Sequence, residues 1–167
     1  MALEVLGAAL VYVGFVLVIN GLNLLGKIEA KDAAMINLFT AVVTFTSSYY
    51  NLFILKSPIA WAQGLLFSFT YFWVFANIVR GITDQRAFGW YCLMVAITAV
   101  ISGGLTLPLA DIGSRYLAFL WFEWAALWAS FWVLCVLKKG AKPIGYFTII
   151  SGIVTFIPAF YYMLSIW

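Results

Sequence analysis

Residues 116–137, YLAFLWFEWAALWASFWVLCVL, decide the fold class, because they form a long apolar run with one charged side chain, Glu123. A helix needs about 20 mostly apolar residues to cross the hydrocarbon core of a bilayer. The run is continuous, whereas the strands of a membrane β-barrel alternate apolar and polar residues with a period of two. The stretch therefore predicts a membrane-spanning α-helix.

The rest of the chain has the same character. Apolar residues make up 66% of the 167 residues and charged residues only 9%, whereas a soluble domain is roughly half apolar and about a quarter charged. Too little polar surface remains to cover a globule in water, so lipid is the expected solvent for most of the surface. The basic residues are spread over short connections, and we expect no patch that could follow a nucleic acid.

Charged and turn-forming residues interrupt the apolar sequence at five places and leave six candidate spans. The expected spans are 3–25, 33–55, 59–80, 87–108, 116–137 and 144–166. We therefore predict an all-α integral membrane protein, a six-transmembrane-helix bundle that forms a single domain over residues 1–167. No basic segment precedes the first stretch, which is longer than the apolar core of a signal peptide, so a retained span is expected.

The basic residues are divided unequally between the two sides of this predicted bundle. The first, third and fifth connections carry seven of them: Lys27, Lys31, Arg80, Arg86, Lys138, Lys139 and Lys142. The second and fourth connections carry only Lys56 and Arg115. The positive-inside rule places the seven in the cytoplasm and both termini outside, which agrees with an even number of spans.

Helical spacing identifies two strips of the first span as candidate packing surfaces. Apolar side chains share one strip: Leu6, Leu10, Val13 and Leu17. Glycines recur every seven residues on the strip beside it: Gly7, Gly14 and Gly21. Small residues allow helix backbones to approach closely in lipid, so the glycine strip should face a neighbouring helix.

Polar side chains gather on one side of the third and sixth spans. In the third span they are Gln63, Thr70, Tyr71 and Asn77, together with Phe67; in the sixth they are Thr148, Ser151, Thr155 and Tyr162. Polar groups are costly to expose to lipid, so both faces should point into the bundle. There they would either hydrogen-bond between helices or line a wet path.

Four tryptophans follow one another at spacings of three, four and four: Trp121, Trp124, Trp128 and Trp132. Tryptophans usually gather at the membrane interfaces, but this row passes through the depth of the bilayer. It predicts either a packed core or an aromatic slot. Glu123 lies on the flank of the row, next to Leu127. A carboxylate at this depth is costly, so it either has a functional role or bonds to a neighbouring helix or subunit.

Several functions are excluded by residues that the sequence lacks. There is no histidine, which removes Ser–His hydrolysis, histidine metal sites and histidine pH sensing. No Gly-rich phosphate loop or metal-ligand spacing is present, and Cys92 and Cys135 are expected to be packing residues. We therefore expect no cofactor, no metal and no enzyme activity. Passive passage of a neutral solute, or a purely structural role, remains.

Several short segments occur in a characteristic order. They are Leu10-Val11-Tyr12-Val13-Gly14, Asn20-Gly21, Gly64 to Tyr71, Trp90-Tyr91, Trp121-Phe122-Glu123-Trp124, Leu127-Trp128, Ser151-Gly152, Thr155 and Ile157-Pro158-Ala159. With six spans, the chain resembles the urea and amide channels of the AmiS/UreI family over essentially its whole length. The resemblance implies a homohexamer in a bacterial inner membrane, with one pore in each protomer. It also implies passive conduction of urea or short-chain amides to a cytoplasmic urease or amidase.

The resemblance places the pore lining on three spans, at Leu6, Leu10, Val13, Leu17, Phe67, Tyr71, Trp124, Leu127 and Trp128. Trp121 joins this set from the tryptophan row. Ser151 joins it because it aligns, across a one-residue gap, with a pore carboxylate in the sixth span of an acid-gated family member. Glu123 is then the candidate intramembrane acid that could stand in for that carboxylate.

Two features of the acid-gated member are missing from this sequence. The long outer loop between spans two and three is reduced to Lys56-Ser57-Pro58, and the outer histidines are absent. We therefore predict a passive urea channel that is open at neutral pH. A short-chain aliphatic amide channel on the same scaffold is the first alternative. A structural membrane subunit that conducts nothing is the second, although it gives no reason for the tryptophan row.

Overall fold

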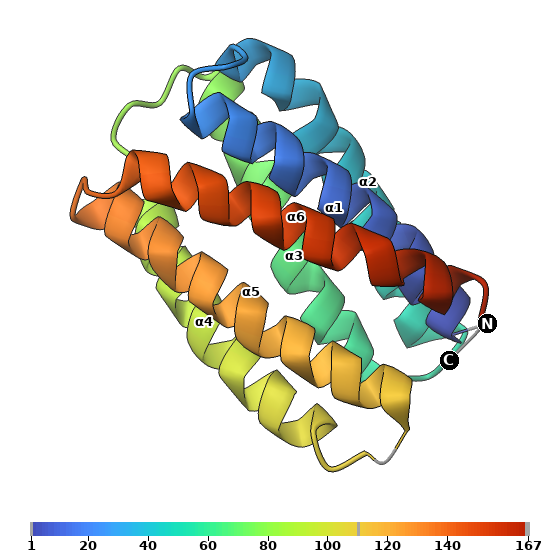
Figure 1. Ribbon diagram of the computed structural model, residues 1–167. Coiled ribbons are helices and arrows are strands. Elements are labelled where there is room, and N and C mark those ends of the chain that lie inside the picture. The colour runs from blue at the N-terminus through green and yellow to red at the C-terminus, as the bar shows by residue number, and fades with distance from the viewer. Residues whose placement is uncertain (1, 110, 166–167) are drawn as a thin grey trace.

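The computed structural model describes residues 2–109 and 111–165, and in this part of the chain it consists of six long α-helices (Figure 1). Their bounds are α1 (Ala2–Leu24), α2 (Ala30–Phe53), α3 (Pro58–Val79), α4 (Arg86–Thr106), α5 (Ile112–Val136) and α6 (Ala141–Met163). The predicted fold class, an all-α bundle of six helices, is confirmed. Each expected span overlaps one helix.

Among the described residues, five helices are long and apolar enough to cross a membrane, and α2 is the helix that falls short. Its polarity lies on the buried face, at Asn37, Thr40, Thr44 and Ser48. The hydroxyls of Thr44 and Ser48 donate to the carbonyls one turn earlier, at 2.7 and 2.6 Å. Hydroxyls bonded in this way can be buried at low cost. The helix is therefore polar toward the bundle rather than toward lipid.

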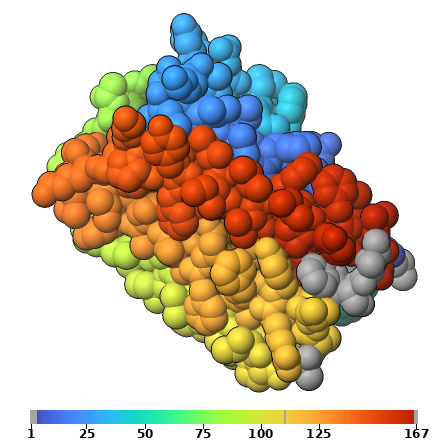
Figure 2. All heavy atoms as spheres, viewed as in Figure 1, coloured from blue at the N-terminus to red at the C-terminus, as the bar shows by residue number. Residues whose placement is uncertain are grey.

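The helices associate most closely in three pairs, in which α1 lies along α6, α2 along α3, and α4 along α5. Figure 1 shows α1 beside α6, with the start of α1 and the end of α6 at the same end of the bundle. We call this the terminal end. The opposite end holds the α1–α2, α3–α4 and α5–α6 connections with their basic residues, and we call it the basic end. Figure 2 shows side chains of α5 and α6 filling the spaces between these ribbons.

The glycine strip of α1 faces α6, as its spacing predicts. A Cβ atom on Gly14 would lie 2.6 Å from the Cβ of Phe156, and one on Gly21 would lie 2.7 Å from the carbonyl oxygen of Gly145. The relation is reciprocal, because a Cβ on Gly152 would lie 2.8 Å from the carbonyl oxygen of Gly14. The close approach of α1 and α6 therefore requires glycine, which has no side chain, at these positions.

The polar face of α6 points into the bundle, as predicted. Its members are fully buried: Thr148, Ser151, Thr155 and Tyr162. The hydroxyl of Tyr162 donates to the carbonyl of Gly113 at 2.6 Å, and the hydroxyl of Thr155 accepts the indole N–H of Trp124 at 2.9 Å. Of the two interpretations of this face, the structure supports hydrogen bonding between helices.

Candidate functional site: two cavities and an aromatic partition

Two cavities lie inside the bundle, one toward each end. The basic-end cavity has a volume of about 330 Å³ and includes Asn23 at the end of α1 and Gln85 before α4 in its lining. The terminal-end cavity has a volume of about 470 Å³ and includes Leu6 at the start of α1 and Ser57 before α3. Both volumes fall in the range of sites for small molecules, roughly 300–1,000 Å³.

One face of α1 runs along both cavities. Leu6, Leu10 and Val13 line the terminal-end cavity. One turn further on, Leu17 and Asn20 line the basic-end cavity. The apolar strip that helical spacing identified therefore lines both cavities.

The two cavities meet at Phe67 of α3 and Trp124 of α5, which line both of them. The rings of these residues are in edge-to-face contact, with centroids 4.9 Å apart. Phe67 also contacts Trp121 and Trp128, at centroid distances of 5.8 and 5.0 Å. We call these four residues the aromatic partition. The helices α3 and α5 face each other here through side chains rather than through close backbone contact.

Hydrogen bonding and burial hold the partition in place. The indole N–H of Trp124 donates to the hydroxyl of Thr155, and the Trp124 side chain is only 2% exposed. Phe67 is 7% exposed and has an indole ring on several sides. Edge-to-face aromatic pairs are each worth about 0.5–1.5 kcal/mol beyond the area that they bury. These rings therefore lie between the two cavities.

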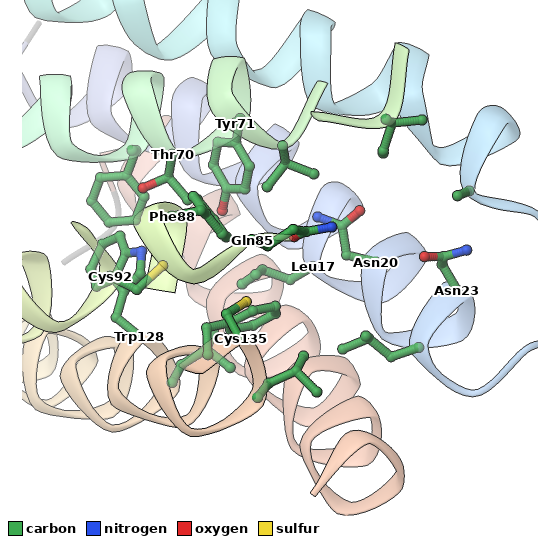
Figure 3. Close-up of a pocket in the computed structure, with 18 of the residues that line it drawn as sticks. Leu17, Asn20, Asn23, Thr70, Tyr71, Gln85, Phe88, Cys92, Trp128 and Cys135 are labelled. Carbon is green, nitrogen blue, oxygen red and sulfur yellow. The ribbon is translucent and has the colours of Figure 1, made fainter. Parts of the chain in front are cut away.

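Four of the predicted pore residues each line only one of the two cavities. Trp121 lines the terminal-end cavity, whereas Leu127, Trp128 and Tyr71 line the basic-end cavity. Figure 3 shows Tyr71 and Trp128 pointing into the basic-end cavity. Tyr71 is 4% exposed, and its hydroxyl has no hydrogen-bond partner among the described residues.

Ser151, which the alignment predicts in the pore lining, and Glu123 lie away from both cavities. In the described part of the chain neither residue lines either cavity. The Ser151 hydroxyl instead donates to Glu123 Oε1, which joins α6 to α5. Ser151 is fully buried because its face of α6 packs against the bundle. Of the two interpretations of Glu123, the structure shows the bond to a neighbouring helix.

Trp132, the last member of the tryptophan row, also turns away from the cavities. Its ring packs edge-to-face on Trp90 of α4, with centroids 5.8 Å apart. At this depth the basic-end cavity is lined by Phe131, Leu134 and Cys135 instead. The cavity-facing side of α5 rotates along the helix, so a straight row of tryptophans does not stay in the wall.

Several polar and thiol side chains also line the cavities, and two of them, Gln63 and Thr70, belong to the polar face predicted for the third span. In the terminal-end cavity they are Thr44, Ser47, Ser48, Asn51, Ser57 and Gln63. In the basic-end cavity they are Asn20, Asn23, Thr70, Thr83, Gln85, Cys92 and Cys135. The polar residues of α2 thus face a cavity, which explains the low hydropathy of that helix. Cys92 and Cys135 are free and buried.

A bundle of apolar helices with two cavities that meet at a narrow partition is the architecture of a membrane transport protein. In the described residues, no group of three or more Cys, Asp and Glu side chains could hold a metal ion. The family model described as the AmiS/UreI family transporter matches residues 5–166. The chain therefore belongs to the AmiS/UreI family.

Relatives and solved structures agree with this family. The chain is 35% identical to an amidate substrates transporter protein of Mycolicibacterium smegmatis, over 96% of this chain and 78% of that one. It is 31% identical to the acid-activated urea channel of Helicobacter pylori strain J99, over 97% of this chain and 99% of that one. The crystal structure of the Helicobacter pylori urea channel superposes with a TM-score of 0.83, at 31% identity and over 97% and 99% of the two chains. The cryoEM structure of that channel in its closed state gives a TM-score of 0.80. The protein is thus a transport protein and not an enzyme.

Proposed function

We propose that each protomer is a single channel domain that conducts urea passively between the two cavities, across the aromatic partition. The observation that carries this proposal is that Phe67 and Trp124 belong to both linings. A shift of one ring would therefore join the cavities into a continuous path. By family resemblance we propose a homohexamer in a bacterial inner membrane, with both termini outside and a urease or amidase consuming the permeant in the cytoplasm.

The lining suits a small, planar, neutral solute. The aromatic partition offers ring faces and edges that can hold a flat molecule by dispersion, and Leu10, Leu17 and Leu127 narrow the path on either side. Tyr71 offers a hydroxyl to the polar edge of the solute. An ion would lose most of its hydration in such a passage, with few charges to compensate, whereas a neutral amide sheds far less. Selection by shape and neutrality needs no energy source.

A short-chain aliphatic amide is the alternative permeant, because one relative is described as an amidate transporter. Urea and acetamide are both planar amides, so the same lining accommodates either. We place urea first because the alignment with the urea channel spans 99% of that relative, compared with 78% for the amidate transporter.

For each of the two solutes, urea and acetamide, the rate of uptake into liposomes that hold the purified protein should be the same at pH 5 as at pH 7.5. Histidine is absent, and normal carboxyl and thiol groups titrate outside this range. Glu123, the candidate intramembrane acid, lines neither cavity. The guanidinium of Arg86 hydrogen-bonds to Asp84, 2.6 Å from Nη2 to Oδ2, and lowers the pKa of that carboxyl to about 2. Hydrogen bonds from Ser114 lower the pKa of Asp111. Both acids therefore stay ionised throughout.

Stopped-flow light scattering measures these rates, and the urea-to-acetamide ratio chooses between the two permeants. Uptake that appears only at pH 5 would show acid gating through another group. If protein that is folded and inserted gives uptake no faster than empty liposomes, the proposed conduction between the cavities is wrong. The result would then favour a structural subunit.

Trp128→Ala should change urea permeability severalfold and shift the urea-to-acetamide ratio, while the assembly stays intact. Trp128 is 6% exposed and contacts Phe67 on the basic-end side, so its loss widens that cavity but leaves Trp124 in the partition. The matched control is Trp132→Ala, which removes the same ring from a position that faces Trp90. Equal effects of the two changes on the ratio would remove Trp128 from the mechanism.

A further inference from the structure

The side-chain amides of Asn20 in α1 and Asn37 in α2 form a reciprocal pair. Nδ2 of Asn37 donates to Oδ1 of Asn20 at 2.8 Å, and Nδ2 of Asn20 donates to Oδ1 of Asn37 at 3.0 Å. Asn37 is fully buried and lies behind the cavity wall. Asn20 is partly buried and lines the basic-end cavity, as Figure 3 shows.

The orientation of both amides is fixed by one backbone carbonyl. The second N–H of Asn37 donates to the carbonyl oxygen of Ala33, at 2.8 Å. A carbonyl oxygen can only accept, so the nitrogen of Asn37 must face Ala33 and its oxygen must face Asn20. Asn20 then has to direct one N–H to that oxygen and its own oxygen to the nitrogen of Asn37. Neither amide can flip without losing hydrogen bonds.

The pair leaves one N–H of Asn20 available. In the part of the chain that the structure describes, no group accepts this hydrogen. Tyr71 lines the same cavity with a hydroxyl that also lacks a partner among the described residues, although its side chain is 4% exposed. Figure 3 shows Tyr71, Gln85 and Asn20 around the same part of the cavity. Both groups, the Asn20 amide and the Tyr71 hydroxyl, border the space of the cavity, where a ligand of the right chemistry can hydrogen-bond to them.

We propose that Asn20 is a binding residue that gives the basic-end cavity its preference for neutral carboxamides, and that Asn37 is its positioning residue. This inference rests on the proposed function. The free N–H of Asn20 donates to the carbonyl oxygen of the permeant, and the Tyr71 hydroxyl accepts an amide N–H from it. The lining contains Lys138 but no carboxylate, so no charged group competes for the amide hydrogens. A donor held in one direction distinguishes a carbonyl from an alcohol better than a freely rotating hydroxyl does.

The test is the ratio of urea permeability to ethylene glycol permeability in liposomes. In Asn20→Leu this ratio should fall roughly fivefold to tenfold, the effect of one lost hydrogen bond, because urea slows while ethylene glycol does not. The matched control is Asn77→Leu. Asn77 of α3 is buried and lines neither cavity, and its Nδ2 has no hydrogen-bond partner among the described residues. The control should keep the wild-type ratio.

Asn20→Leu leaves the buried amide of Asn37 without its partner, so a second variant guards against misfolding. Asn20→Leu/Asn37→Leu removes both amides and leaves no orphan. In this double variant the ratio of urea permeability to ethylene glycol permeability should fall as far as in Asn20→Leu, and the protein should be stable. Asn37→Leu alone should lower the ratio by a smaller factor, because Asn20 keeps its donor but loses its fixed direction. A merely structural role of Asn37 would instead slow both solutes in parallel.

The outcomes separate this inference from the proposed function. A wild-type ratio in the folded double variant overturns the role of Asn20 while the channel itself stands. A wild-type protein that passes neither urea nor acetamide faster than empty liposomes overturns the proposed function, and the inference falls with it. A reduced ratio in both Asn20 variants, with the Asn77 control unchanged, supports the assignment.

Discussion

Phe67→Ala should raise urea permeability about tenfold or more and should remove most of the discrimination between urea and larger neutral solutes. The ring of Phe67 contacts three indoles across the bundle, and each such contact is worth about 0.5–1.5 kcal/mol. A barrier lowered by about 1.4 kcal/mol is a tenfold gain in rate. Without the ring, the two cavities that share Phe67 would join.

The measurement is stopped-flow uptake of urea and of glycerol into liposomes at equal protein density. The matched control is Phe69→Ala, which removes the same side chain two residues further along α3, where it is exposed on the outside of the bundle. The control should behave as wild type. Urea permeability that does not rise in a folded Phe67→Ala protein would mean that the path does not cross the partition.

The prediction of the fold succeeds because lipid as solvent leaves few choices. Every backbone group must find a partner within the bilayer, so continuous apolar runs have to become helices. The breaks between runs then fix the number of helices. The packing of the glycine strip of α1 also follows from sequence, because three small residues in line allow a close helix–helix contact. Hydropathy alone does not identify α2 as a membrane-spanning helix, because this helix carries polar side chains that face a cavity or the interior of the bundle.

The candidate site is predicted less completely, and α5 shows why. A helical wheel assumes one inward direction along the whole helix. In the structure the lining moves from Trp121 to Leu127 and then to Leu134, so that Trp132 ends against Trp90. Packed helices cross at an angle, so the side of each helix that faces a fixed path changes with depth. Spacing alone carries no information on that crossing.

Polar pore residues are missed for a different reason. Asn20 continues the helical spacing of Val13 and Leu17 by one more turn, but an amide at the end of an apolar strip does not by itself indicate a cavity. Its place in the lining depends on Asn37, which lies on another helix and is itself hidden. Ser151 and Glu123 show the opposite case, because the Ser151 hydroxyl bonds to Glu123 Oε1 on the neighbouring helix and lies away from both cavities. Pairing between helices is a tertiary property that no single span reports.

Gly14→Leu should destabilise the protein by at least about 3 kcal/mol, the upper end of the usual cost of overpacking. For a chain of this size that corresponds to a fall in Tm of roughly 6–12 °C. A Cβ at Gly14 would lie 3.0 Å from the carbonyl oxygen of Gly152 and 3.0 Å from the Cα of Phe156. Backbone atoms cannot rotate away as a side chain can, so α1 and α6 have to separate along their length.

Thermal unfolding in detergent, followed by size-exclusion chromatography, measures this effect. Gly104→Leu is the matched control, because a Cβ at Gly104 meets no atom within 4 Å, and it should keep the wild-type Tm or raise it slightly. The consequence reaches the site, since α1 carries Leu10, Val13 and Leu17 along both cavities. Gly14→Leu protein that survives purification should therefore also lose urea selectivity. A wild-type Tm in this variant would show that the contact between α1 and α6 can yield without cost.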